Sequence, residues 1–235
     1  METETSSSQT GEDRKPKRRL GRRPISELGV VENKEVILNE AEKVFAMQGY
    51  LGASLKQIAT RSNVTQALIT YYFGTKQNLF LEIYKRRLTE IAKARQAGLL
   101  EIKSKGEPVT LSDVVRTYIT PQFEHRGGGQ DWVYFARMQS RLASEPEEIT
   151  APLRREVYDQ TLKIFIQEMI SCEGVEHHAA VSWGVVFMIA MILYMLRDID
   201  RIGEITDGHV HTGVQADVVE KMTLFITAGI NALKE

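Results

Sequence analysis

The sequence predicts an all-α protein of about nine helices, because apolar residues recur at spacings of three and four from Asn33 onward. No stretch of alternating apolar and polar residues competes with this pattern, so strands are not expected. At 235 residues the chain is long enough for two domains with a core each. We divide it into a flexible basic arm at 1–30, a small helical domain at 31–90 and a larger helical domain at 91–235.

The arm at 1–30 has few large apolar residues and begins with a stretch rich in Ser, Thr and Gly, so no packed core is expected there. Its run RKPKRRLGRRP, from Arg14 to Pro24, holds seven basic residues and no acidic one. Such a run can lie along phosphates or enter a minor groove. A solubilising tail explains the same composition, and both interpretations stay open.

Charge is distributed unevenly along the chain. Residues 1–80 hold 12 Lys and Arg against 9 Asp and Glu, whereas residues 81–235 hold 18 against 22. A basic front and an acidic rear indicate that the front meets a polyanion. The single cysteine, Cys172, excludes an internal disulfide, and the polar start METETSSSQTGED is not a secretory signal. We therefore expect a cytoplasmic protein.

Four helices are expected between residues 33 and 106. The first has an apolar face and ends at Gly49. The second opens at Ser54, where Ser54-x-x-Gln57 reads as a capping box, and Thr65 caps the third. Thr75 starts a long fourth helix. The apolar face of the first helix is formed by Ile37, Ala41, Val44 and Phe45.

Five further helices are expected in the rest of the chain: Leu111–Ile119, Trp132–Ala143, Ala151–Ser171, Glu176–Asp198 and Gln215–Leu233. The fourth of these contains 18 residues without a charge, from Ala179 to Leu196, which is borderline for a membrane span. A buried helix is favoured, because Ser182 and Gly184 lie inside the stretch and charged residues follow it directly.

The segment SLKQIATRSNVTQALITYYFGTK, from Ser54 to Lys76, places two short helices around a tight turn, which is typical of a helix-turn-helix. Asn63 tolerates the left-handed conformation that such a turn requires. If Ile69 and Phe73 face inward, the opposite face carries glutamine, threonine and leucine side chains that can read base edges, and no acidic residue. An ordinary helical hairpin is the alternative.

Two motifs carry a family resemblance. F-x-x-x-G-Y-x-G-x-S-x-x-x-I-A, from Phe45 to Ala59, followed by N-V-T-x-x-x-I-x-Y-Y-F-G-T-K, resembles the amino-terminal domain of the TetR family of transcriptional repressors. The resemblance covers residues 31–90 closely and rests on helix count and length beyond them. It implies a three-helix DNA-binding domain and a larger helical domain that binds a small molecule and forms a homodimer.

The resemblance also implies roles for individual residues. Ser54 and Lys56 match backbone-contacting positions, and the far end of the recognition helix, with Tyr71, Tyr72 and Lys76, matches phosphate contacts. The recognition positions themselves are Thr65, Gln66, Ala67, Leu68 and Thr70. Ala67 stands where glycine is frequent in the family and Thr70 where tyrosine is frequent, so no operator sequence is inferred by analogy.

Tight specific binding needs more contacts than one such domain makes, so we expect a symmetric dimer reading two half-sites about 34–36 Å apart, or a multiple of that, on a roughly palindromic operator. The last two helices are the expected interface, because their apolar faces exceed what one protomer covers. The residues that suggest this are Val185, Ile189, Ile192, Met222, Phe225 and Ile226.

The central region is rich in methionine and aromatic residues, which line adaptable pockets and also fill ordinary cores. For any single residue the core is favoured, but the resemblance implies a pocket among helices four to eight. Few buried charges stand out, so the expected ligand is an apolar or amphipathic organic molecule. The candidate lining residues are Trp132, Phe135, Met138, Phe165, Met169, Trp183, Phe187 and Met191.

These observations favour a dimeric repressor that a small ligand releases from its operator by tilting the fourth helix. A helical DNA-binding regulator controlled by a protein partner, with no small-molecule pocket, is the alternative, and a membrane-associated or enzymatic helical protein is a third reading. No nucleophile–base pair or phosphate loop appears, so neither catalysis nor a cofactor is expected. The spacing of His177, His178, His209 and His211 does not supply a zinc site, so no metal is expected.

Overall fold

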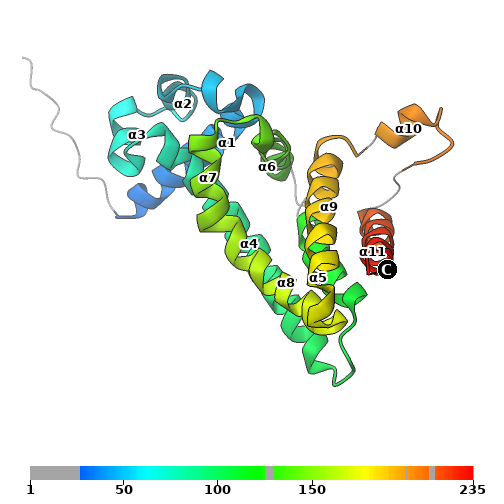
Figure 1. Ribbon diagram of the computed structural model, residues 1–235. Helices are drawn as coiled ribbons and strands as arrows, with labels where there is room; N and C mark the ends of the chain where they lie inside the picture. Colours follow the sequence, from blue (N-terminus) through cyan, green and yellow to red (C-terminus); the bar gives the residue numbers. More distant parts are fainter. Residues whose placement is uncertain (1–26, 125–129, 200, 212–214, 235) are drawn as a thin grey trace, which may run out of the picture.

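The computed structural model describes residues 27–124, 130–199, 201–211 and 215–234, and every regular element in these ranges is a helix. The predicted arm at 1–30 lies almost entirely outside the described residues. Figure 1 shows a group of short helices at one end of the molecule, from which α4 extends toward the opposite end. There α11 packs against both α5 and α9. The all-α prediction is confirmed.

The N-terminal elements are α1 (Glu27–Gly52), α2 (Leu55–Arg61), α3 (Gln66–Phe73) and α4 (Lys76–Ser104). Side-chain oxygens of Ser54, Thr65 and Thr75 accept hydrogen bonds from backbone N–H groups three residues later, at 3.2, 3.2 and 3.1 Å. These bonds confirm the helix starts predicted from capping residues. Gly49 has φ 73° and ψ 175°, so the helical path is broken where the sequence predicted a stop.

The core of this N-terminal group continues into the larger domain. Ile37, Phe45, Ile58, Ile69 and Phe73 are buried, as their spacing predicted. A chain of aromatic contacts then connects α1 to α6, with ring centroids 5.0, 5.0 and 5.3 Å apart in the pairs Phe45–Phe80, Phe80–Tyr84 and Tyr84–Phe135. The hydrophobic packing is therefore continuous between the two predicted domains, whose boundary the sequence analysis placed at residue 90.

The larger domain holds α5 (Leu111–Glu124), α6 (Gln130–Arg141), α7 (Glu147–Leu153), α8 (Asp159–Glu173), α9 (His178–Arg197), α10 (Arg201–Ile205) and α11 (Gln215–Ala232). A π-helical turn at Arg154–Tyr158 joins α7 to α8. A second core forms between α5, α8, α9 and α11, with Phe123, Phe165, Val181, Met188 and Ile230 fully buried.

Three helix boundaries differ from the predictions for physical reasons. Pro121 was expected to end α5, but the helix continues because burial of Gln122 and Phe123 offsets the lost backbone hydrogen bond. The helix predicted at Ala151–Ser171 begins at Glu147 and is divided by the π turn. The polar loop predicted before α11 contains α10, so the described residues hold eleven α-helices rather than about nine.

Helix α9 is long and apolar enough to cross a membrane by length and composition, with a mean hydropathy of 2.2 and 39% of its window buried in the protomer. Its buried side packs against α6, α8 and α11. A side chain at Gly184 would force Ile230 to shift, because an added Cβ would overlap the Ile230 side chain. Glycine thus allows α11 to approach α9 closely.

Candidate nucleic-acid interface and cavity

Helix α3 presents a polar face to solvent. Ile69 and Phe73 are buried against the N-terminal core, which leaves Thr65, Gln66 and Thr70 exposed. Ala67 and Tyr71 are exposed as well, and Leu68 is partly buried. The predicted orientation of this helix is therefore the observed one, and no acidic residue lies on α2 or α3.

The turn before α3 is fixed by backbone geometry. Asn63 has φ 53°, in the left-handed region that asparagine tolerates. The N–H of Ser62 donates to the carbonyl of Ile58 at 2.9 Å, and that of Val64 donates to Ala59 at 3.0 Å. These bonds close the turn and set the angle between α2 and α3, which is the arrangement of a helix-turn-helix.

The exposed side chains of α3 differ in what they can still bind. The Thr70 hydroxyl donates to the carbonyl of Gln66 at 3.2 Å, so it is left to accept rather than donate. The Thr65 hydroxyl accepts from the N–H of Leu68 as the helix cap. The Gln66 amide makes no hydrogen bond within the described part of the chain, and its donor and acceptor together match the edge of an adenine.

The two tyrosines at the end of α3 are not equivalent. Tyr71 is 80% exposed, and its ring meets that of Tyr72 edge-on with centroids 5.4 Å apart. The hydroxyl of Tyr72 is buried and has no hydrogen-bond partner in the described structure. The sequence led us to expect two phenols reaching phosphate, but Tyr71 alone presents its hydroxyl to solvent.

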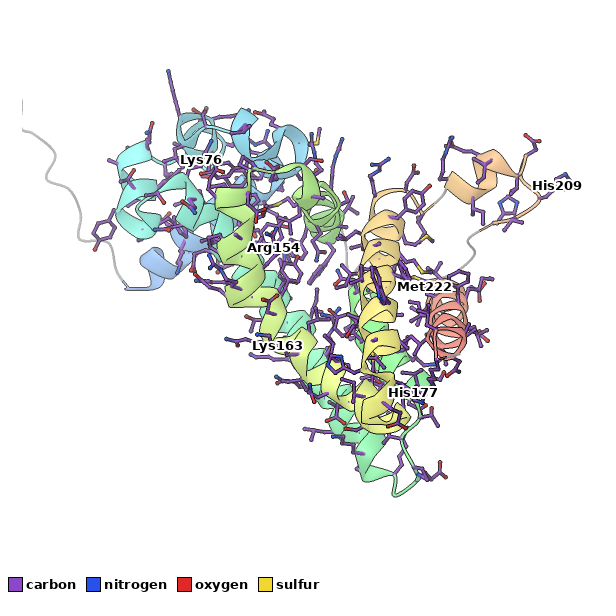
Figure 2. The ribbon with its side chains drawn as sticks, in the orientation of Figure 1. Lys76, Arg154, Lys163, His177, His209 and Met222 are labelled. Atoms are coloured by element: carbon purple, nitrogen blue, oxygen red, sulfur yellow. The ribbon has the colours of Figure 1, made fainter. Side chains whose placement is uncertain are left out.

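Lys76 also differs from the expectation of a free cation. Figure 2 shows it among the N-terminal helices, where its ammonium donates to the carbonyls of Tyr50 and Ala53 at 2.9 and 3.0 Å. The ammonium also lies 4.3 Å from the centre of the Tyr50 ring. Lys76 thus joins the start of α4 to the end of α1. Lys56, by contrast, is exposed on α2, two residues after the Ser54 cap.

The end of α1 is held from the larger domain as well. Arg141, at the end of α6, donates to the carbonyls of Ala46 and Met47 at 3.0 and 3.2 Å. The carboxylate of Glu145 accepts from the N–H of Tyr50 at 2.9 Å. Nothing in the residue pattern indicated these contacts, because they join positions about 95 residues apart. They connect α6 to the segment that leads directly into α2.

Helices α1 and α4 are joined by a buried ion cluster. The carboxylate of Glu42, 2% exposed, accepts from Arg86 at 2.8 Å and from Arg87 at 2.9 Å. The Arg87 guanidinium lies over the ring of Trp132 on α6, 4.7 Å from its centre. These ion pairs join α4 to α1, and the contact with Trp132 joins α4 to α6 at the same level.

A cavity of about 180 Å³ lies between the helices of the larger domain. Its apolar wall comes from Leu142, Leu162, Ile189, Ile192 and Leu193. Its polar lining comes from Arg95 on α4, Tyr118 and Gln122 on α5, Gln139 on α6, and Arg154, Tyr158 and Asp159 at the junction of α7 and α8. Figure 2 places Arg154 near the middle of the molecule, between the N-terminal helices and α9.

The residues predicted to line a pocket do not converge on this cavity. Phe135, Met138, Phe165 and Met169 are packed inside the two cores. Trp132 lies under Arg87, whereas Trp183 and Phe187 are more than half exposed on α9. Sequence reasoning missed Arg95, although it follows Leu88 and Ile91 on the buried face of α4, where an arginine is unusual.

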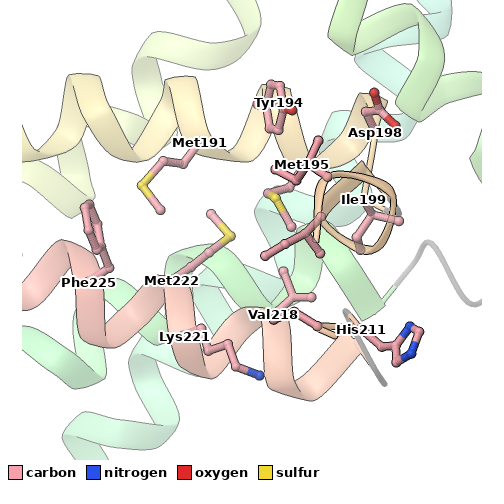
Figure 3. Close-up of a pocket in the computed structure, with 13 residues that line it drawn as sticks. Met191, Tyr194, Met195, Asp198, Ile199, His211, Val218, Lys221, Met222 and Phe225 are labelled. Carbon is pink, nitrogen blue, oxygen red and sulfur yellow. The ribbon is translucent and has the colours of Figure 1, made fainter. Parts of the chain in front are cut away.

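Met191 lines a different cavity, of about 360 Å³, between α9, α10 and α11. In Figure 3, Met191 of α9 and Met222 of α11 point toward each other across this space. No residue of α1 to α6 lines it, so a ligand there would have no direct contact with α4. No group of three or more His, Cys, Asp and Glu side chains within the described ranges is placed to hold a metal ion.

The fold and the exposed α3 define a helix-turn-helix protein with a second, larger helical domain. Two family descriptions match it: "Bacterial regulatory proteins, tetR family" over residues 37–83, and "Tetracyclin repressor-like, C-terminal domain" over residues 116–229. The chain belongs to the TetR family of transcriptional regulators. Members of this family are transcription factors and not enzymes, which agrees with the expectation that the chain has no catalytic role.

Individual relatives are similar over limited parts of the chain. The transcriptional repressor NicS of Pseudomonas putida is 40% identical over 47 residues, which are 20% of this chain and 22% of NicS. The repressor AcnR of Corynebacterium glutamicum is 30% identical over 71 residues, or 30% of this chain and 38% of AcnR. The matched part thus spans well under half the length of these curated relatives.

Solved structures share the whole fold at low sequence identity. The regulator FadR from Bacillus subtilis, in complex with stearoyl-CoA, superposes with a TM-score of 0.58 and 16% identity. The alignment covers 83% of this chain and 98% of FadR. This similarity supports the fold and does not identify an operator or a ligand for this chain.

Proposed function

We propose that the protein is a dimeric transcriptional repressor that binds a roughly palindromic operator through α3 and is released by a small organic ligand. The observation that carries this proposal is the outward face of α3, where Gln66 and Thr70 are exposed and no acidic side chain repels phosphate. The family supports it, since both curated relatives described above are named as repressors. Such a protein acts in the cytoplasm.

The proposed DNA contacts follow from the hydrogen-bond donors and acceptors that each exposed side chain does not use within the protein. Gln66 reads a base edge in the major groove, and Thr70 accepts a hydrogen bond from a base amino group. Tyr71 and Lys56 contact phosphates on either side, with Ser54, Thr65, Ala67 and Leu68 lining the same surface. Lys76 has one ammonium hydrogen left for phosphate, and Tyr72 supports the ring of Tyr71.

Selection from a pool of random duplexes tests DNA binding directly. The purified full chain should retain pseudo-palindromic fragments, with affinity that falls steeply as salt rises. Lys56→Ala should reduce the slope of log affinity against log salt by about one for each half-site. Gln167→Ala on the exposed side of α8 is the matched control and should change nothing. A protein that retains no duplex in low salt is not a repressor of this kind.

The proposed dimer interface is the outer face of α9 and α11. Phe187 on α9 is 51% exposed and Phe225 on α11 is 69% exposed, and large apolar side chains exposed together on neighbouring helices mark an interaction surface. The other members of this surface are Trp183, Val186, Tyr194 and Leu224. Pairing two such faces gives a four-helix bundle and spaces two reading helices for one operator.

The composition of this face differs from the set first expected. Val185, Ile192, Met222 and Ile226 are buried within the protomer's own core, and Ile189 is partly buried against it. Phe225 alone of the expected six is well exposed. Helix periodicity identifies an apolar helix but not which side a neighbouring helix of the same chain has already covered.

Phe187→Glu tests the dimer against a membrane role for α9. The variant should be a monomer by light scattering, and its operator affinity should fall sharply, whereas Leu100→Glu on an exposed part of α4 should remain a dimer. Wild-type protein that is monomeric in buffer and sediments with phospholipid vesicles would support the membrane reading instead.

Ligand release is proposed to act through α4 and α6. The cavity of about 180 Å³ touches both helices, and each is tied to α1, by the Glu42 cluster and by Arg141 respectively. A ligand that favours one tilt of these helices shifts the population toward dimers with unsuitable spacing. Control by a protein partner is the alternative, and it predicts no ligand-dependent change in thermal stability.

A further inference from the structure

The cavity between α4, α5, α6, α8 and α9 encloses a cation without a counter-charge. Arg95 is 5% exposed, and its Nε donates to the backbone carbonyl of Tyr118 at 2.8 Å. The guanidinium carbon lies 3.6 Å from the centre of the Tyr118 ring. No carboxylate of a described residue lies within 4.0 Å of it, and the carbonyl and ring of Tyr118 that it contacts carry no charge. A buried charge left in this state is unfavourable.

Other cations near this level of the molecule are paired. Arg154, which lines the same cavity, is joined to Glu147 at 2.5 Å, and Arg86 and Arg87 share Glu42. Asp159 is the one acidic residue in the lining, and it does not lie within ion-pair distance of Arg95. Burial lowers the pKa of the Arg95 guanidinium, while the phenols of Tyr118 and Tyr158 act in the opposite direction.

A second donor faces the same space. Gln122 donates to the side-chain oxygen of Gln139 at 2.8 Å, and Gln139 donates to the hydroxyl oxygen of Tyr158 at 3.2 Å. The O–H of Tyr158 is thereby left to donate. Burial raises the pKa of this phenol, so it stays protonated at neutral pH. The cavity thus offers a guanidinium and a phenol to an acceptor, between walls of leucine and isoleucine.

The size and charge of the site limit what fits. A cavity of about 150 Å³ holds a benzene molecule, so a site of about 180 Å³ suits a slightly larger body. One unpaired guanidinium is neutralised by one negative charge, and a carboxylate matches its two parallel N–H donors. A doubly charged phosphate would bring an excess of charge into an apolar site.

We propose that this cavity binds a small apolar carboxylate, of the size of benzoate or a six-carbon fatty acid, whose carboxylate pairs with Arg95 and accepts from Tyr158. This rests on the proposed ligand-responsive function and defines the chemistry of its ligand. Arg95 is one buried charge in a region where the sequence predicted few. Gln139 lies two residues before Arg141, so a ligand bonded to Tyr158 acts on the helix that holds the end of α1.

Sodium benzoate and sodium hexanoate, each against its own amide, are the probes. Calorimetric titration and thermal shift of the full chain should show binding of at least one carboxylate about tenfold or more tighter than its amide. Arg95→Met should abolish this preference while the unliganded protein keeps its melting temperature or gains a little. Arg155→Met, at an exposed site in the π-helical turn that also carries Tyr158, should leave binding unchanged.

Tyr158→Phe keeps the ring and removes the hydroxyl donor, so it should weaken carboxylate binding several-fold. This variant also tests the proposal if Arg95→Met fails to fold. Equal binding of acid and amide, or no binding of either acid at millimolar concentration, overturns the proposal. Operator binding measured on the same samples separates the two levels. If the wild type binds DNA but neither acid, the repressor function stands and the carboxylate ligand is overturned. If it binds an acid but no DNA, the repressor function is overturned and the carboxylate site stands.

Discussion

Two stretches of α4 place their arginines in opposite surroundings. Next to the N-terminal helices, Arg86 and Arg87 share the buried carboxylate of Glu42, so that their charges hold α1 against α4. About two turns further on, Arg95 has a backbone carbonyl and an aromatic ring as neighbours and no carboxylate. The comparison teaches that the arginine charges of the first stretch are paired within the protein, whereas the second stretch has a charge still to be neutralised.

Removing the shared carboxylate should have the largest effect. Glu42→Gln leaves the guanidinium of Arg87 without a counter-charge and that of Arg86 with only the half-exposed Glu35, so the free energy of unfolding should fall by about 3–5 kcal/mol in urea denaturation. Glu35→Gln removes a carboxylate that is 54% exposed and also pairs with Arg86, and it should cost less than about 1 kcal/mol. Equal losses in the two variants would mean that burial of the cluster contributes nothing.

Substitution by methionine should change the free energy of unfolding differently at Arg87 and at Arg95. Arg87→Met breaks the hydrogen bonds to Glu42 and should lower the free energy of unfolding by about 1.5–3 kcal/mol. Arg95→Met removes an unpaired charge and should leave that free energy unchanged or higher. Denaturation of both variants without ligand measures the difference. A loss at Arg95 as large as that at Arg87 would show that its charge is already satisfied within the protein.

Lys76 and Lys56 of the N-terminal domain allow a similar comparison. The ammonium of Lys76 is hydrogen-bonded within the protein, whereas Lys56 is exposed to solvent. Lys76→Met loses two hydrogen bonds to carbonyls and should cost about 1–2 kcal/mol of unfolding free energy. Lys56→Met should leave stability unchanged within about 0.5 kcal/mol, because the side chain is exposed and makes no ion pair with any residue that the structure describes. A variant of Lys76 with full stability would contradict the role that its contacts indicate.

The smallest effect concerns a carboxylate of the larger domain that is fully satisfied. Asp113 accepts from the hydroxyl and N–H of Thr110 at 2.6 and 3.0 Å, and these bonds lower the pKa of its carboxyl group. A lowered pKa stabilises the folded state above the unfolded pKa of about 3.9, and the contribution is lost as pH falls through the folded pKa. Asp113→Asn should therefore cost about 0.5 kcal/mol at pH 7 and less near pH 3. A difference between wild type and variant that grows on acidification would contradict this sign.

Much of the fold followed from local chemistry. Ser54, Thr65 and Thr75 mark helix starts because their side chains replace missing backbone partners, and Asn63 marks the turn because it tolerates a positive φ. These signals lie within four residues of what they determine. Pro121 misled for the same reason, because its cost is local and the burial of Phe123 that offsets it is not.

The site was less predictable, because its contacts join distant parts of the chain. Lys76 is the right residue type for phosphate, but its ammonium is held by carbonyls 23 and 26 residues earlier. Tyr72 looks equivalent to Tyr71 in sequence, yet its hydroxyl is buried. Arg95 was detectable in principle from its place on the apolar face of α4, but the missing carboxylate is visible only once α5 and α8 are packed around it.

The central claim is that α3 reads DNA through Gln66, and the affinity of Gln66→Ala for the selected operator tests it most directly. The account predicts a loss of about 1–3 kcal/mol for each base contact removed, with relaxed preference at one position in each half-site and unchanged thermal stability. A variant that selects the same sequences with the same affinity would contradict it.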